Sequence, residues 1–69
     1  IAFLQAMARD NGSSRMSDIA GRMKQSPDYA QKYRKRLIDA GVISAAGHGY
    51  VTFAIPYMRE HLRKMAFDL

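Results

Sequence analysis

Residues 26 to 51, SPDYAQKYRKRLIDAGVISAAGHGYV, carry the clearest structural signals of the chain. Ser26 and Pro27 are residue types that start helices, because a serine side chain accepts a hydrogen bond from a free backbone N–H and proline suits the first helical position. Gly41 is a stop signal, since glycine readily adopts the left-handed conformation that commonly follows a helix. The sequence therefore predicts a helix from Pro27 to about Ala40.

Two short strand-like runs follow this helix. Residues 42–45 (VISA) and 50–53 (YVTF) are rich in β-branched and aromatic side chains, which favour strands. Between them, residues 47–49 (GHG) favour a tight turn, because glycine tolerates positive φ. We therefore expect a hairpin directly after the helix, with alternate residues of its second half facing the core: Val51, Phe53 and Ile55.

Three further helices are expected around this segment. Residues 1 to 9 place an apolar row on one helical face, with Phe3 beside it: Ile1, Leu4, Met7 and Ala8. After a turn and a very short strand at Arg15-Met16, Ser17 is predicted to cap a second helix whose inward residues are Ile19, Ala20 and Met23. Pro56 is predicted to open a last helix that extends to about Phe67 and places these residues on one face: Met58, Leu62, Met65 and Leu69.

Together these elements predict a single domain, residues 1–69, that is mainly α with a small β-hairpin (α+β), in the order α, short β, α, α, β, β, α. A gap of two or three residues between the second and third helices is the helix-turn-helix arrangement. The chain has no cysteine, which excludes disulfides and thiolate metal sites. No apolar run approaches ~18 residues, and no secretory signal pattern is present, so we expect a cytoplasmic protein. Because the chain begins at Ile1 in an apolar helical pattern, we expect it to be the C-terminal fragment of a longer protein.

The charge balance points to an anionic partner. The formal net charge is +5 on only 69 residues, which favours nucleic acid first and a membrane surface or an acidic protein second. On the predicted third helix, an apolar row is expected to face inward: Ala30, Tyr33, Leu37 and Ala40. The opposite face then carries the polar residues Asp28, Gln31, Lys32 and Lys35, with Tyr29, Arg36 and Arg34 on its flanks.

This outward face predicts an interface for duplex DNA, because the major groove admits one helix. Gln31 is a candidate for pairing with adenine, Arg36 for a phosphate or guanine, and Tyr29 for a phosphate or sugar. His48 at the hairpin tip is a candidate for a phosphate or the minor groove. The full candidate set is Ser26, Asp28, Tyr29, Gln31, Lys32, Arg34, Lys35, Arg36 and His48. An alternative is that Asp28 with Lys32, and Lys35 with Asp39, are ordinary i,i+4 pairs on a solvated face.

No pattern in the sequence indicates catalysis. His48 and His61 lack the spacing of metal ligands, and residues 47–49 are not surrounded by the βαβ unit of a dinucleotide-binding loop. We expect no enzyme activity, cofactor or metal in this domain. The last helix carries Arg59, Arg63 and Lys64, but its apolar face is needed to close a small core, so we do not expect membrane binding. That face is also a candidate dimer contact.

RLIDAGVI, residues 36–43, resembles the end of the recognition helix and the start of the wing in winged-helix regulators of the MarR and ArsR sort. There the pattern is roughly R-L-x-x-A/L-G-L/V-I. The likeness covers residues 15 to 55 and implies a winged helix-turn-helix fold.

A narrower resemblance covers nearly the whole chain. RMSDIAGRMKQSPDYAQKYRKRLIDAGVI (residues 15–43) and GHGYVTFAIPYMREHLR (residues 47–63) look like the winged helix that ends certain bacterial ATPases of the AAA type. This likeness implies an ATP-binding module before Ile1, with none of its nucleotide-binding residues in this chain. Relatives often carry arginine at the wing tip, where this chain has His48. The rival expectation is a winged helix used for protein contact or dimerisation within such an ATPase, with exposed Tyr29, Tyr57 and Phe67.

Overall fold

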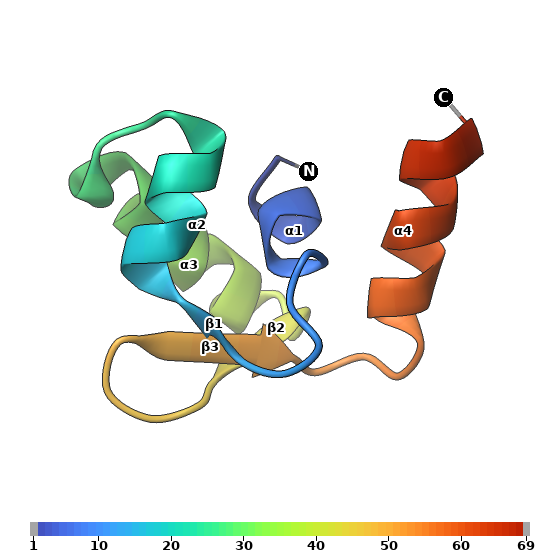
Figure 1. The fold of residues 1–69 in the computed structure, drawn as a ribbon. Coiled ribbons are helices and arrows are strands. Elements are labelled where there is room, and N and C mark those ends of the chain that lie inside the picture. The colour runs from blue at the N-terminus through green and yellow to red at the C-terminus, as the bar shows by residue number, and fades with distance from the viewer. Residues whose placement is uncertain (1, 69) are drawn as a thin grey trace.

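The structure, a computed structural model, describes residues 2–68, and the side chains of residues 2–65. The described part is a small α+β domain of four helices and a three-stranded antiparallel sheet (Figure 1), which confirms the predicted class. The elements in chain order are α1 (Ala2–Met7), β1 (Ser14–Arg15), α2 (Met16–Met23), α3 (Pro27–Asp39), β2 (Ile43–Ala45), β3 (Tyr50–Phe53) and α4 (Met58–Asp68). The predicted roles of Ile1 and Leu69, and of the Phe67 side chain, lie outside the described residues.

The sheet has the order β1-β3-β2, with both pairings antiparallel. β2 and β3 form the predicted hairpin, in which Ser44 lies opposite Thr52. β1 is added on the other side of β3, with Arg15 opposite Tyr50. The Met16 N–H donates to the carbonyl of Gly49 at 2.8 Å, so the hairpin turn is tied to the start of α2.

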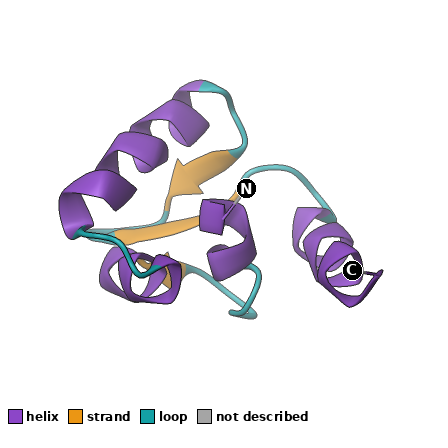
Figure 2. Ribbon diagram, turned by 90° about the horizontal axis from the view of Figure 1, so that it is seen from above, coloured by secondary structure: helices purple, strands orange, loops and turns teal. Residues whose placement is uncertain are grey.

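The core lies between the helices and one face of the sheet. The largest fully buried apolar side chains come from α1, α2, β2 and β3: Phe3, Met7, Ile19, Ile43 and Val51. α3 contributes Ala30, which is completely buried, and its small side chain lets that helix lie close to the rest of the core. Figure 2 shows α3 and α4 on opposite sides of α1.

α3 begins and ends where the sequence predicts. The Ser26 hydroxyl accepts a hydrogen bond from the Tyr29 N–H at 3.2 Å, and Pro27 is the first helical residue. At the other end Gly41 has φ 77°, and the N–H groups of Gly41 and Val42 donate to the carbonyls of Ile38 and Leu37. This pair of bonds is a Schellman motif, which satisfies carbonyls that the helix leaves free.

The start of α2 differs from the prediction. Ser17 does not cap the helix; the N-cap is Arg15, whose side chain makes no cap hydrogen bond. The reason is that pairing with β3 holds Arg15 extended, so the chain passes directly from strand to helix at Met16. The predicted short strand is correspondingly one residue earlier, at Ser14–Arg15.

The segment between β3 and α4 also differs. Pro56 does not open α4, because Tyr57 has φ 65°, a left-handed conformation that a helix cannot contain, and the helix begins at Met58. Ile55 does not face the core: pairing ends at Phe53, so the alternation stops there, and Ile55 is 40% exposed.

Two smaller corrections concern the apolar rows. Ala40 is exposed, because it is the C-cap of α3 and lies beyond the helical row. In α1 the buried face is centred on Phe3, Ala6 and Met7, while Leu4 is half-buried, because both α2 and α4 pack against this short helix. In α2 the predicted inward residues are confirmed, with Met23 only partly buried.

None of the helices described in residues 2–68 is long and apolar enough to cross a bilayer.

Candidate nucleic-acid interface

α3 presents its basic face to solvent. Ala30 is buried and Tyr33 and Leu37 pack on the core, as the apolar row predicts. Gln31, Lys32, Lys35 and Arg36 are all exposed. The predicted orientation of the helix is therefore confirmed, and the charges of its two lysines are not hidden against the rest of the domain.

One flank of α3 carries a row of aromatic and cationic side chains. The rings of Tyr29 and Tyr33 are 5.1 Å apart between centroids, and the Tyr29 hydroxyl donates to the Tyr33 hydroxyl at 3.4 Å. The guanidinium carbon of Arg36 lies 5.6 Å from the centre of the Tyr33 ring. The hydrogen bond to Tyr33 raises the pKa of the Tyr29 hydroxyl, so this group remains a neutral donor and acceptor at physiological pH. The row offers planar faces and hydroxyls beside the lysines.

The other candidates on α3 are less free. Ser26 is exposed, but its hydroxyl is engaged as the helix cap. Arg34 is half-buried, which places it at the edge of the basic face. Asp28 is exposed in the first turn, and among the described residues it forms no ion pair with Lys32. Its charge instead lies where the helix dipole favours an acid.

Of the two i,i+4 ion pairs that were the alternative explanation of the basic face, the pair Lys35–Asp39 is present. Lys35 Nζ lies 3.3 Å from Asp39 Oδ2, with the two side chains 80% and 66% exposed. An exposed i,i+4 pair of this kind contributes only about 0.2–0.5 kcal/mol. Because this contact is weak, Lys35 remains available to an anion that binds it more tightly than Asp39 does.

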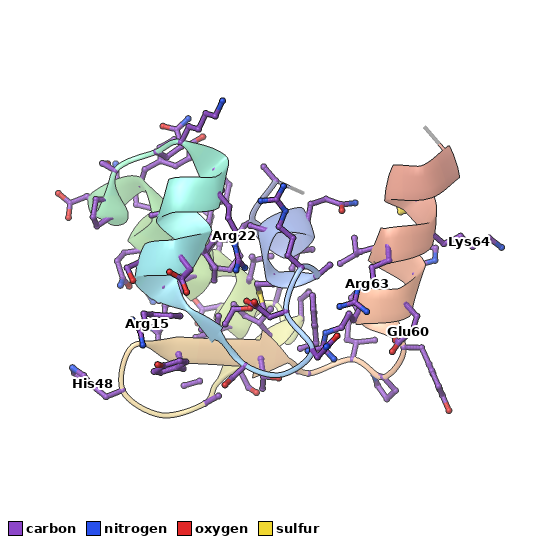
Figure 3. All side chains as sticks on the ribbon, viewed as in Figure 1. Arg15, Arg22, His48, Glu60, Arg63 and Lys64 are labelled. Carbon is purple, nitrogen blue, oxygen red and sulfur yellow. The ribbon has the colours of Figure 1, made fainter. Side chains whose placement is uncertain are left out.

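The hairpin turn carries the last of the predicted contact residues. His48 is exposed between two glycines of positive φ, at 101° for Gly47 and 78° for Gly49. Figure 3 shows Arg15 at the same end of the sheet as His48. Sequence reasoning missed Arg15, because its position depends on β1 pairing with β3. The polar turn before Arg15 and the strand-like residues 50–53 indicate that two strands could form here. The sequence does not give the register in which these strands pair.

Arg15 is held by a single neighbour on β3. Its Nε and Nη2 donate to the Tyr50 hydroxyl oxygen at 3.1 and 2.9 Å. The guanidinium carbon is 5.6 Å from the centre of the Tyr50 ring. These hydrogen bonds raise the pKa of Arg15 above its ordinary value, so the group is always charged. The side chain is exposed and fixed at the same time.

The basic side chains near α4 are used differently. Arg63 donates to the carbonyls of Ala8 and Asp10 and to the Asn11 side chain, at 2.7, 3.3 and 2.9 Å. Arg59 donates to the carbonyl of Gly12 at 2.9 Å. These bonds tie α4 to the loop between α1 and β1, whereas Lys64 extends away from the domain in Figure 3.

The same loop is fixed from the other side by Arg22 of α2. Its Nη1 and Nη2 bond to the two carboxylate oxygens of Asp10 at 2.8 and 3.1 Å, and Ser14 donates to that carboxylate at 2.7 Å. Two hydrogen bonds, the larger effect from Arg22 and the smaller from Ser14, lower the pKa of Asp10 to about 2. Arg22, Arg59 and Arg63, none of which was a predicted DNA contact, thus all donate hydrogen bonds to residues 8–12. Within the described residues, no three metal-ligating side chains lie together.

The chain belongs to the DUF8462 family, which is described as a domain of unknown function and whose profile matches residues 1–62. Neither a curated protein nor a solved structure matches the chain. The matched region includes α3, the hairpin and β1, so the candidate interface lies within the domain that defines the family.

Proposed function

We propose that this domain is a winged helix-turn-helix module that binds duplex DNA. The proposal is supported by the three-residue turn 24–26 between α2 and α3, and by the hairpin that follows α3 directly. In this interpretation α3 is the recognition helix and the β2–β3 hairpin is the wing. Figure 1 has the start of α3 and the hairpin turn on one side of the molecule, away from α4.

The observation that carries the proposal is the exposed basic face of α3. Lys32, Lys35 and Arg36 project into solvent while Ala30 anchors the opposite side of the helix. A helix of this width fits the major groove, where cationic side chains reach phosphates and polar ones reach base edges. We assign phosphate contacts to the cations and the positions nearest the bases to Gln31 and Tyr29. Arg34 takes a peripheral contact, and Asp28 discourages a close approach of phosphate to the first turn.

On the sequence resemblance alone, we also propose that the module is an accessory part of a larger cytoplasmic protein, an AAA-type bacterial ATPase. The module itself would then contribute no catalytic residue. It would hold the parent protein on DNA with weak affinity of its own. A Kd in the ~10⁻⁴–10⁻⁶ M range is typical of contacts made mainly to the backbone.

The test is fluorescence anisotropy with labelled random duplex DNA at low salt. Four neutralised phosphates predict that log K falls with log salt at a slope of about −3.6. Lys32→Glu with Lys35→Glu should abolish the binding signal, because the phosphates would then face two carboxylates.

The matched control is Arg9→Glu with Lys64→Glu. Both residues are exposed, neither lies on α3, and the change in net charge is the same. The control should retain most of the binding. Equal loss in both double variants would mean that overall charge, and not α3, attracts the DNA. An unchanged α3 double variant would remove this helix from the interface.

A second candidate function has its own observation. Tyr57 is 83% exposed and Ile55 40% exposed, on a turn where Tyr57 adopts a left-handed φ of 65°. A bulky residue in that conformation costs about 1–3 kcal/mol, and here no burial repays it. This supports a protein-contact role, either for docking within a larger protein or for dimerisation. Absence of DNA binding at ~100 μM protein, the weak limit of the ~10⁻⁴–10⁻⁶ M range, would favour it.

A further inference from the structure

At the end of β1, one arginine is held by hydrogen bonds that use two of its five N–H donors. Arg15 gives its Nε and Nη2 edge to a single oxygen, the Tyr50 hydroxyl. Its Nη1 makes no hydrogen bond among the described residues. The two terminal nitrogens therefore present a fork to solvent, and this fork matches two oxygens of a phosphate.

The orientation of this fork is set before any ligand arrives. An arginine side chain has many rotamers, and a flexible surface arginine loses this conformational entropy when it binds. The two bonds to Tyr50 and the antiparallel pairing of Arg15 with Tyr50 restrict the side chain in the free domain. Preorganisation of this kind lowers the cost of binding.

The neighbours of Arg15 leave the site open to an anion. Asp18, in the first turn of α2, is the carboxylate whose field acts on Arg15, but the two form no ion pair. The hairpin turn is bonded to the start of α2 through Met16 and Gly49, which brings the turn that carries His48 close to Arg15. Both lie at the end of the sheet seen at the left of Figure 3.

We propose that Arg15 binds a backbone phosphate of the DNA, beside the groove that α3 enters, and that Tyr50 is the positioning residue that aims it. This inference rests on the proposed function. It makes Arg15, and not His48, the principal ionic contact of the hairpin region. A phosphate contact carries no sequence information, so its consequence is to fix the orientation of α3 on the duplex.

The experiment compares Arg15→Ala with Lys64→Ala in the same anisotropy titration across a range of salt concentrations. Each variant removes one positive charge, and Figure 3 shows Lys64 pointing away on the opposite side of the domain. Loss of one phosphate contact should reduce the magnitude of the salt slope by about 0.9, which lowers affinity about tenfold near 0.1 M salt. The loss should be equal for different duplex sequences. Lys64→Ala should keep the wild-type slope.

Tyr50→Phe tests the positioning role, because it keeps the aromatic ring and removes only the oxygen that Arg15 contacts. Its salt slope should stay close to the wild-type value, since the charge remains, while its affinity falls by less than that of Arg15→Ala. A structural role for Tyr50 alone would lower thermal stability without changing affinity at a temperature where the domain is folded.

Each result separates the two proposals. If the α3 double variant loses binding and Arg15→Ala keeps the slope of Lys64→Ala, the inference on Arg15 is wrong and the proposed function stands. If the wild-type domain does not bind duplex DNA, both are wrong. Should Arg15→Ala fail to fold, Arg15→Gln decides the matter, because it retains polar contact with Tyr50 without the charge.

Discussion

Both sides of the domain carry basic side chains, but these differ in how many hydrogen bonds they make to the rest of the domain. On the side of α3 and the hairpin, Lys32, Lys35 and Arg15 extend into solvent with at most one partner each. On the side of α4, Arg59 and Arg63 donate to four groups of the loop at residues 8–12. All of these residues count equally toward the net charge. Only the first group is available to another molecule.

The role of each basic side chain therefore depends on its hydrogen-bond partners in the folded domain, and not on its place in a basic stretch of sequence. Loop carbonyls that no strand or helix satisfies need donors, and the α4 arginines supply them. At α3, by contrast, the last carbonyls are satisfied locally, because the N–H groups of Gly41 and Val42 donate to Ile38 and Leu37.

The largest stability effect is expected at Arg63. Arg63→Ala removes three hydrogen bonds to the 8–12 loop and should lower the free energy of unfolding by about 2 kcal/mol, since bonds to charged groups are stronger than neutral ones. Thermal unfolding should show a Tm lower by about 10 °C in a domain of this size. Lys64→Ala is the control and should unfold like the wild type. A variant that keeps its Tm but binds DNA less tightly would place Arg63 in the interface and end the contrast.

A smaller effect is expected at Asp10, and it depends on pH. Because Arg22 and Ser14 lower the pKa of Asp10 to about 2, the folded state binds fewer protons than the unfolded state, whose carboxyl titrates near 3.8. The stabilisation is therefore present above about pH 3.8 and is lost as the pH falls through about 2.

Asp10→Asn measures this contribution. It should lower the free energy of unfolding by about 1 kcal/mol at pH 7, a value set by the partial exposure of the pair. In urea titrations the gap to the wild type should narrow between pH 4 and pH 2 and close below pH 2. Asp39→Asn, which breaks the exposed pair with Lys35, should cost no more than about 0.5 kcal/mol. A gap as large at pH 2 as at pH 7 would contradict the assignment to the Asp10 carboxylate.

The smallest stability effect is expected at Lys35. Lys35→Ala removes only a surface pair and replaces lysine with a better helix former, so the free energy of unfolding should change by less than about 0.5 kcal/mol. The salt slope of DNA binding should nevertheless lose about 0.9 in magnitude. Loss of stability without a change in slope would make Lys35 a structural residue, like the arginines of α4.

Local signals in the sequence predicted the elements well where the chain carries its own start and stop chemistry. Ser26, Pro27 and Gly41 bound α3 as expected, because capping and positive φ depend on a few neighbouring residues. The predictions failed where a distant partner intervened. Ser17 is not a cap, because β3 holds the preceding residue extended, and Pro56 does not begin α4, because Tyr57 turns into the left-handed region.

The candidate site shows the same division. The exposure of Lys32 and Lys35 follows from the helical period of the apolar residues opposite them. The participation of Arg15 does not, because it depends on strand register, and a shift of one residue would move its side chain to the other face of the sheet. The engagement of Arg59 and Arg63 also depends on a loop about fifty residues earlier in the chain.

Short-range periodicity, capping and simple counting are enough to predict the order of the elements, the limits and buried face of α3, and the excess of positive charge. They do not predict which cations are free, because this depends on the folded chain. That outcome is set by hydrogen bonds between segments far apart in the chain, whose unsatisfied carbonyls and hydroxyls become neighbours of an arginine only when the chain folds.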